Sequence, residues 1–83
     1  MDIVSPTHLG SIIRQKREEL GKTQQELSQL AGVSRLWINQ VEQGKENASF
    51  QLILRTLNAL DLKLSATDRD YGRSQINLVF EDL

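Results

Sequence analysis

The apolar residues at the start of the chain recur at the spacing of an amphipathic helix. Ile12 and Ile13 follow Leu9 by three and four positions, so the three side chains lie on one face of a helix. A Ser-Pro pair precedes this block, and serine and proline are favoured at the N-cap and at the first helical position. Gly21 suits the left-handed residue that ends many helices. The pattern therefore predicts a first helix over residues 6–20.

Two short helices are predicted next, with a turn between them. Thr23 and Glu26 have the spacing of a capping box at the start of the first, and Gly32 ends it. Ser34 is suited to cap the second, which covers residues 35–43 and stops before a further glycine. The pattern is typical of a helix-turn-helix, in which the second helix enters the major groove of DNA. Many small helical bundles share this pattern, so a plain scaffold stays an alternative at this point.

A fourth helix and a strand follow. Ser49 is suited to cap the helix, and five apolar residues are spaced to cover a core: Phe50, Ile53, Leu54, Leu57 and Leu60. Residues 62–67 then alternate between apolar and polar, which indicates a strand that needs a partner. The predicted fold is mainly α: a four-helix bundle with a helix-turn-helix, plus one short strand that pairs with its copy in a dimer. In that pairing Leu62, Leu64 and Ala66 face a shared core.

The last residues, 68–83, show no cap and no clear helical period. The polar stretch around Gly72 offers little apolar area to offset the entropy cost of ordering. We therefore predict a domain over residues 1–67 and a mobile tail over 68–83. The apolar part of that tail is predicted to dock a partner or to be sensitive to degradation, through Ile76, Leu78, Val79 and Phe80. The alternative is that Ile76–Phe80 adds a strand to the dimer sheet or packs on the helices.

Composition narrows the function. The chain has 83 residues, no cysteine and a single histidine, His8. Disulfides and thiolate metal sites are therefore excluded, one histidine cannot make a zinc site unaided, and no metal site is predicted. There is no glycine-rich phosphate loop and no cluster of carboxylates, so we predict neither an enzyme nor a cofactor. No apolar run approaches the roughly 20 residues of a membrane span, and the start does not resemble a signal peptide. A cytoplasmic protein is expected, with no membrane partner.

The overall charge does not favour nucleic-acid binding. The net charge is −1, whereas DNA-binding domains are usually basic. Residues 1–45 carry six Lys/Arg against five Asp/Glu, and residues 46–83 carry four against six. A basic face must therefore come from the placement of individual side chains.

The outward face of the predicted third helix has the side chains that read bases. With Ile38 and Val41 facing the core, the opposite side presents Leu36, Asn39, Gln40 and Gln43, with Arg35 on the flank. Arginine suits guanine, asparagine and glutamine suit adenine, and leucine can pack on a thymine methyl. For Leu36, a dimer contact or a satellite core contact is the alternative.

Phosphate contacts are predicted around this helix. Lysines and small polar side chains near helix N-termini make such contacts. For Trp37, packing at the edge of the core is favoured over DNA contact, although its indole N–H can reach a phosphate. The complete set of predicted phosphate-binding residues is Lys22, Thr23, Gln24, Trp37, Lys45 and Asn47.

The sequence resembles the phage-repressor/Cro (XRE) helix-turn-helix family over about residues 9–60. The resemblance rests on TQQELSQLAGVS at residues 23–34, followed by Ile38, Val41-Glu42 and Gly44-Lys45. Within that family, the Ser-Pro-Thr start at residues 5–7, Leu9-Gly10, Ile13-Arg14, Arg17 and the Leu-x-Leu strand resemble antitoxins of the HipB type. The sequence departs from the pattern at Leu36, where a polar reader is common, and at Ala48, where proline is frequent.

The resemblance implies roles for particular residues. Ser34, Arg35, Leu36, Asn39 and Gln40 match base-reading positions, and Gln24 matches a phosphate-bonding glutamine. Arg17 and Glu42 match a structural ion pair. It also implies a dimer with paired strands, a palindromic operator on double-stranded DNA before a toxin operon, and a HipA-like serine/threonine kinase toxin as partner. The chain is thus expected to be a homodimeric repressor and antitoxin. The alternatives are a stand-alone phage-type repressor, or an interaction module that neutralises a toxin without binding DNA.

Overall fold

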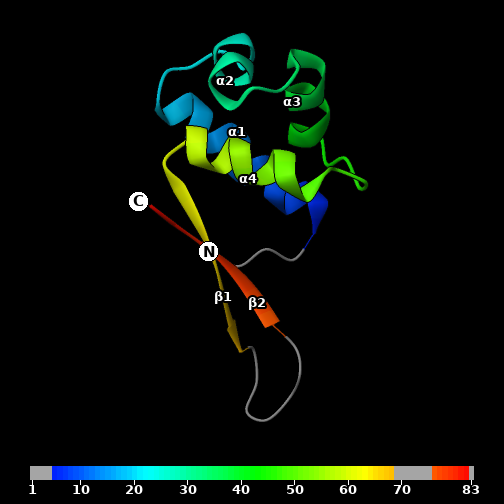
Figure 1. Ribbon diagram of the computed structural model, residues 1–83, viewed down its shortest axis with the longest axis vertical. Coiled ribbons are helices and arrows are strands. Elements are labelled where there is room, and N and C mark those ends of the chain that lie inside the picture. The colour runs from blue at the N-terminus through cyan, green and yellow to red at the C-terminus, as the bar shows by residue number, and fades with distance from the viewer. Residues whose placement is uncertain (1–4, 69–75, 83) are drawn as a thin grey trace.

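The computed structural model describes residues 5–68 and 76–82, with side chains described up to Ser65. Within these residues, four helices are followed by two strands (Figure 1). The elements are α1 (Pro6–Glu19), α2 (Gln24–Ala31), α3 (Arg35–Glu42), α4 (Phe50–Ala59), β1 (Leu62–Asp68) and β2 (Ile76–Asp82). The mainly helical fold predicted from the sequence is confirmed.

The helices begin where their capping residues predict. Each N-cap side chain accepts a hydrogen bond from a backbone N–H three residues later, which satisfies a donor that the helix leaves free. These N-caps are Ser5, Thr23, Ser34 and Ser49. In α2 the capping box is complete, because Glu26 also accepts from the Thr23 N–H at 2.9 Å.

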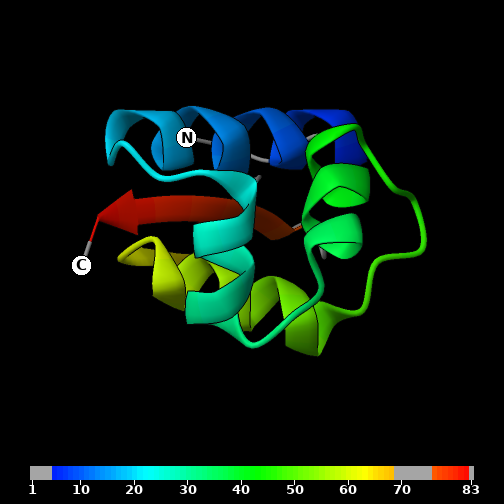
Figure 2. The same cartoon turned by 90° about the horizontal axis from the view of Figure 1, so that it is seen from above.

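The core lies where the helices meet. Ile13, Leu27, Ile38 and Leu57 come from α1, α2, α3 and α4 in turn, and all four side chains are fully buried. Seen from above, α1 and α4 lie on opposite sides, with α2 and α3 spanning between them (Figure 2). Leu62 of β1 joins the same cluster, so the start of the strand is fixed to the helices.

Two residues expected to cover the core lie largely outside it. Phe50 is 58% exposed and Leu54 is 38% exposed, whereas Leu57 of the same helix is buried. The apolar residues of α4 spread over a wider part of the helix circumference than α2 and β1 cover. Phe50 and Leu54 lie at one edge of this apolar surface, beyond the covered part. The outer side of α4 therefore carries an apolar strip.

The segment after β1 differs from the predicted mobile tail. Ile76–Asp82 forms β2, which pairs antiparallel with β1 and sets Leu64 opposite Phe80 and Ala66 opposite Leu78. The alternative prediction, in which these residues add a strand, therefore describes them better than a mobile tail. The partner of β1 in this structure is a strand of the same chain. The physical reason is that β1 has N–H and C=O groups that need partners, and the β-branched and aromatic residues of β2 favour a strand. Gly72 lies outside the described residues.

The strands project from one end of the helical body. In Figure 1, β1 leaves α4 and runs away from the helices, while α2 and α3 lie at the opposite end of the molecule. The hairpin and the outward face of α3 are therefore well separated.

Candidate nucleic-acid interface

The α2, turn and α3 segment has helix-turn-helix geometry. Gly32 has a φ of +71°, the left-handed conformation predicted at this position, and its N–H bonds the carbonyl of Ser28. Val33 is half-buried against the core. Ser34 then caps α3, and its hydroxyl accepts the Trp37 N–H at 3.0 Å. The turn thus redirects the chain while the core holds it, so α2 and α3 have a fixed mutual orientation.

One face of α3 is buried and the other is open. Trp37, Ile38 and Val41 are buried. Among the residues predicted to read bases, Leu36, Asn39 and Gln40 lie on the other side, Arg35 lies on the flank, and Ser34 is the N-cap. Asn39 is half-buried and the other four are exposed. Gln43 is also exposed. The structure therefore gathers the predicted base-reading residues at one accessible surface, which we call the α3 face.

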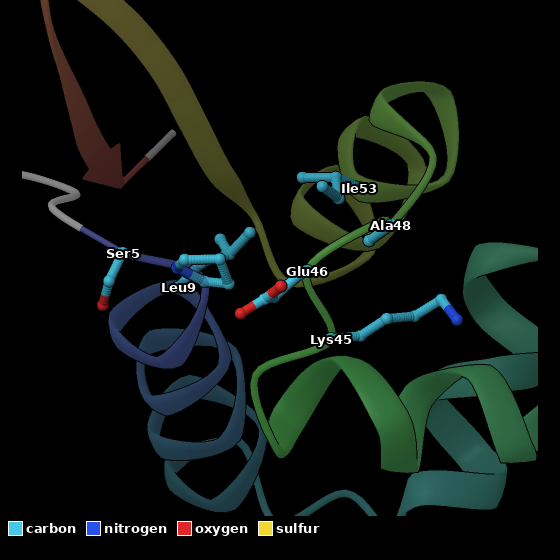
Figure 3. A pocket seen from close by; sticks show the side chains of 7 residues that line it. Ser5, Leu9, Lys45, Glu46, Ala48 and Ile53 are labelled. Atoms are coloured by element: carbon cyan, nitrogen blue, oxygen red, sulfur yellow. The ribbon is translucent and has the colours of Figure 1, made fainter.

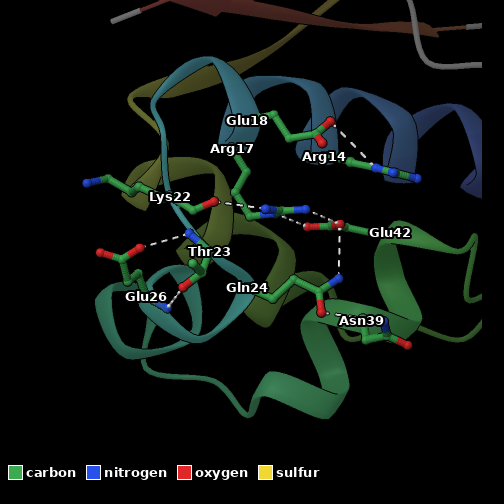
Figure 4. A network of polar contacts seen from close by, with 9 residues as sticks. All are labelled: Arg14, Arg17, Glu18, Lys22, Thr23, Gln24, Glu26, Asn39 and Glu42. Atoms are coloured by element: carbon green, nitrogen blue, oxygen red, sulfur yellow. Dashed lines mark hydrogen bonds and ion pairs between the residues drawn. The ribbon is translucent and has the colours of Figure 1, made fainter.

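A buried ion pair joins α1 to α3 (Figure 4). The Arg17 Nε donates to Glu42 Oε2 at 2.7 Å and Nη2 donates to Oε1 at 3.1 Å, while Nη1 donates to the Lys22 carbonyl at 2.8 Å. Only 12% of the Arg17 side chain and 3% of the Glu42 side chain are exposed. The hydrogen bond to Glu42 raises the pKa of Arg17 above its ordinary value. The pair predicted from the family resemblance is present and bidentate, the strongest form of such contacts.

A chain of side-chain amides connects this ion pair to the α3 face. Gln24 Nε2 donates to Glu42 Oε1 at 3.2 Å, and Gln24 Oε1 accepts from Asn39 Nδ2 at 3.4 Å. Asn39 Oδ1 in turn accepts from Gln43 Nε2 at 3.0 Å. These contacts fix the amides of Gln24 and Asn39 relative to a buried charge (Figure 4). A preorganised polar surface of this kind loses little conformational entropy when it binds.

Arg14 is a candidate contact that the sequence did not reveal. It borders a polar hollow of about 220 Å³ together with Arg17, Gln24, Asn39, Glu42 and Gln43. Its side chain is 64% exposed and pairs with Glu18 at 3.6 Å, also on the surface. The signal available in the sequence was its position three residues before Arg17 on the same helix. Arg14 therefore adds a long, exposed cationic side chain beside the amides of the α3 face.

The predicted phosphate contacts lie in two segments. Lys22, Thr23 and Gln24 form the start of α2, where Thr23 is exposed and the other two are half-buried. The Thr23 N–H also lowers the pKa of Glu26 below its ordinary value by donating to the carboxylate. Lys45 and Asn47 lie in the segment between α3 and α4, half-buried and exposed respectively.

Trp37 does not share the exposure of these residues. It is 9% exposed and belongs to the core cluster, in agreement with the packing role favoured from the sequence.

A second hollow, of about 290 Å³, lies beside Lys45 and has a different character (Figure 3). Apolar side chains from the start of α1, the α3–α4 segment and α4 line much of it, and its lining residues are Ser5, Pro6, Leu9, Lys45, Glu46, Ala48 and Ile53. Ala48 and the core residue Leu9 both border this hollow.

The comparison with known families agrees with this geometry. A profile described as a helix-turn-helix domain matches residues 8–70, which is most of the chain. The chain belongs to the helix-turn-helix family, in its XRE (phage-repressor/Cro) branch. It is a DNA-binding protein and not an enzyme.

Particular relatives refine this placement. The chain is 30% identical to Antitoxin HipB of Escherichia coli O6:H1 over 66 residues, which cover 80% of this chain and 70% of that protein. It is similar to a chain of the HipA-HipB-O2-O3 complex, with 27% identity, a TM-score of 0.77 and coverage of 84% and 99% of the two chains. It is also similar to the restriction-modification controller protein C.AhdI from Aeromonas hydrophila, with 34% identity, a TM-score of 0.64 and coverage of 68% and 85%.

Within the described residues, no helix is both long and apolar enough to cross a membrane. In the same part of the chain, no cluster of histidine, cysteine, aspartate and glutamate is placed to hold a metal ion.

Proposed function

We propose that this DNA-binding protein is a transcriptional repressor that binds a palindromic operator as a homodimer. The observation that carries the proposal is the α3 face, which exposes Arg35, Leu36 and Gln40 on a helix whose other side is fixed in the core. A solvated helix surface usually carries lysine and glutamate at four-residue spacing, whereas this surface carries side chains that match base edges. We assign base reading to Ser34, Arg35, Leu36, Asn39 and Gln40.

Phosphate contacts surround this face in the proposal. Lys22, Thr23 and Gln24 lie at the start of α2, where the helix dipole also attracts a phosphate. Lys45 and Asn47 flank the other end of α3, and Arg14 adds a contact from α1. Because Gln24 also bonds Asn39 at 3.4 Å, one amide links phosphate binding to base reading.

The dimer is proposed to form through α4 and the hairpin. Phe50 and Leu54 are one helical turn apart and expose apolar side chains on α4, the helix that packs against β1. Leu62 is buried and Leu64 is half-buried against the helices. The intrachain pair uses one edge of β1 and one edge of β2, so the outer edges remain for a copy. A two-fold dimer presents two α3 helices about 34–36 Å apart, one turn of DNA.

The antitoxin role is proposed from the similarity to HipB. The HipA-HipB-O2-O3 complex shows a neighbour of similar fold assembled with HipA. We infer that this chain binds a HipA-like serine/threonine kinase toxin and represses its own operon. The residues from Ile76 to Phe80 are proposed to contribute to that contact as part of the hairpin. The test is co-purification with the product of a neighbouring kinase-like gene, with a variant truncated after Thr67 as the comparison.

DNA binding is tested by a gel shift over a salt series. The duplex is the region upstream of the gene, and the competitor is a duplex of shuffled sequence. We expect the logarithm of the binding constant to fall steeply and linearly with the logarithm of salt concentration, because phosphate contacts release counterions. No shift of the upstream duplex at low salt would overturn the proposal and would favour an interaction module that works without DNA.

A second candidate is a controller without a toxin. The similarity to C.AhdI, at 34% identity, favours a small regulator of a neighbouring operon of another kind. The two candidates share DNA binding and differ in the partner. A kinase-like product that binds the protein supports the antitoxin, whereas operator binding with no such partner supports the controller.

A further inference from the structure

Leu36 is an anomaly on the α3 face. It is 65% exposed. The side of α3 that packs on the core is already occupied by Trp37, Ile38 and Val41, so the core does not require a further apolar residue on this helix. With Asn39, Gln40 and Gln43 it follows the spacing i, i+3, i+4 and i+7, so all four lie along one stripe of the helix. An apolar side chain therefore stands in line with the three amide side chains of the α3 face.

The surroundings argue against a protein contact at this position. The exposed apolar pair Phe50 and Leu54 belongs to another helix, α4. The hairpin lies at the far end of the molecule from α3 (Figure 1). A homodimer that buried Leu36 would also cover Arg35 and Gln40, which the proposed function needs free. The exposure of 65% excludes a satellite core contact.

We propose that Leu36 senses the C5 substituent of a pyrimidine in the operator, so that binding depends on a methyl group there. This inference rests on the proposed base reading by α3. Leucine has no hydrogen-bonding group, and the apolar group that base edges present in the major groove is the thymine methyl. A 5-methylcytosine presents the same methyl at the same ring position. Operator binding is therefore sensitive to cytosine C5 methylation when a cytosine replaces that thymine.

The test begins with operator duplexes selected from random sequence by the full-length protein. Each thymine is then replaced singly by uracil, which removes the methyl and keeps the base pair. We expect one thymine per half-site at which uracil weakens binding about fourfold, the value of one buried methyl, and about fifteenfold when both half-sites are changed. At that position a cytosine duplex binds more weakly, and C5 methylation of the cytosine recovers about fourfold of the affinity.

The variant Leu36→Ala identifies the side chain responsible. It binds thymine and uracil duplexes equally, and cytosine and 5-methylcytosine duplexes equally, with its thermal unfolding unchanged. Leu30→Ala, which alters a leucine of similar exposure on α2 (59%), keeps the full discrimination.

Equal affinity of the unaltered protein for thymine and uracil at every position would overturn the inference while leaving the proposed DNA binding intact. Dissociation of the dimer by Leu36→Ala would also overturn it, because Leu36 would then be a protein contact. Absence of salt-dependent DNA binding would instead overturn the proposed function.

Discussion

Gly10 of α1 lies directly against the backbone of Val41 in α3. A Cβ on Gly10 would overlap the Val41 carbonyl oxygen and would also press on the carbonyl of Glu42. Since these neighbours are backbone atoms of a packed helix, they cannot rotate away as a flexible side chain would. This contact sets how closely α1 approaches α3, and therefore how Arg17 of α1 reaches Glu42.

We predict that Gly10→Ala destabilises the protein by at least about 1–3 kcal/mol, the usual cost of overpacking, despite the better helix propensity of alanine. Urea unfolding followed by circular dichroism measures the change. The control is Ser11→Ala, one position along on the exposed side of α1, which should shift stability by less than about 0.5 kcal/mol. An unchanged midpoint for Gly10→Ala would mean that α1 and α3 can separate without loss.

Removing one partner of the buried ion pair should be costly. We predict that Glu42→Ala lowers the free energy of unfolding by about 3–5 kcal/mol, because it leaves the Arg17 guanidinium buried without its partner. A double variant with Arg17→Met and Glu42→Leu should lose less than Glu42→Ala alone. Glu18→Ala breaks the exposed pair with Arg14 and serves as the control, with an expected cost of at most about 1 kcal/mol. If Glu42→Ala and Glu18→Ala lowered the free energy of unfolding equally, burial of the Arg17–Glu42 pair would not be the cause.

The base readers and the phosphate contacts should behave differently. Arg35→Ala and Asn39→Ala are each expected to lower operator affinity by about 1–3 kcal/mol and to relax preference at one base pair. Gln24→Ala should weaken all duplexes more evenly. Arg55→Ala removes a charge from the exposed side of α4 and controls for net charge. Binding titrations on operator and single-base variants separate these effects, and an intact Arg35→Ala protein with unchanged preference would remove α3 from base reading.

The apolar strip of α4 gives a test of the dimer. We predict that Phe50→Ser with Leu54→Ser weakens the dimer by at least about tenfold, since burial of such side chains contributes roughly 1.5–3 kcal/mol each. Sedimentation equilibrium over a concentration series measures the dissociation constant. Leu30→Ser, which exposes a similar change on α2, should leave it unaltered. A stable monomer of the unaltered protein at micromolar concentration would reject the dimer itself.

The capping box of α2 predicts a pH dependence of stability. The pKa of Glu26 is lowered in the folded protein chiefly by the hydrogen bond that the Thr23 N–H donates to its carboxylate, so its stabilising effect is present above the unfolded pKa. That effect is lost as the pH falls through the lower, folded pKa. Urea midpoints of the unaltered protein and Glu26→Gln should therefore differ at pH 7 and converge below the ordinary pKa of 4.5. A difference that stays constant down to pH 3 would show that the Glu26 carboxylate is not the source.

The helices were predictable because their signals are local. A cap such as Ser34 and a stop such as Gly32 act within one turn, and the structure confirms both. The exposure of Phe50 was not predictable, because the periodicity of α4 does not tell how wide a face the neighbouring helices cover. The strand at residues 76–82 was not the favoured prediction, which was a mobile tail. Its stability comes from pairing with β1, and an argument from the entropy cost of ordering the segment alone does not include that pairing.

The site shows the same division. The outward face of α3 follows from the helical period and the buried Ile38 and Val41. The amide chain from Glu42 through Gln24 to Asn39 depends on the crossing of three helices, and no sequence spacing encodes it. Arg14 was missed for that reason, because its neighbours in the hollow come from α2 and α3 as well as from α1.

The distance between the α3 face and the hairpin has a consequence for how such a protein diverges. Substitutions on the exposed stripe of α3 touch neither the core nor the strand register, and changes along β2 are remote from α3 (Figure 1). The two ends can therefore accumulate mutations independently, so a change in the proposed DNA specificity does not require a change in the hairpin. By the same reasoning, grafting side chains onto the outside of α3 should change the DNA sequence that the protein prefers without altering its fold.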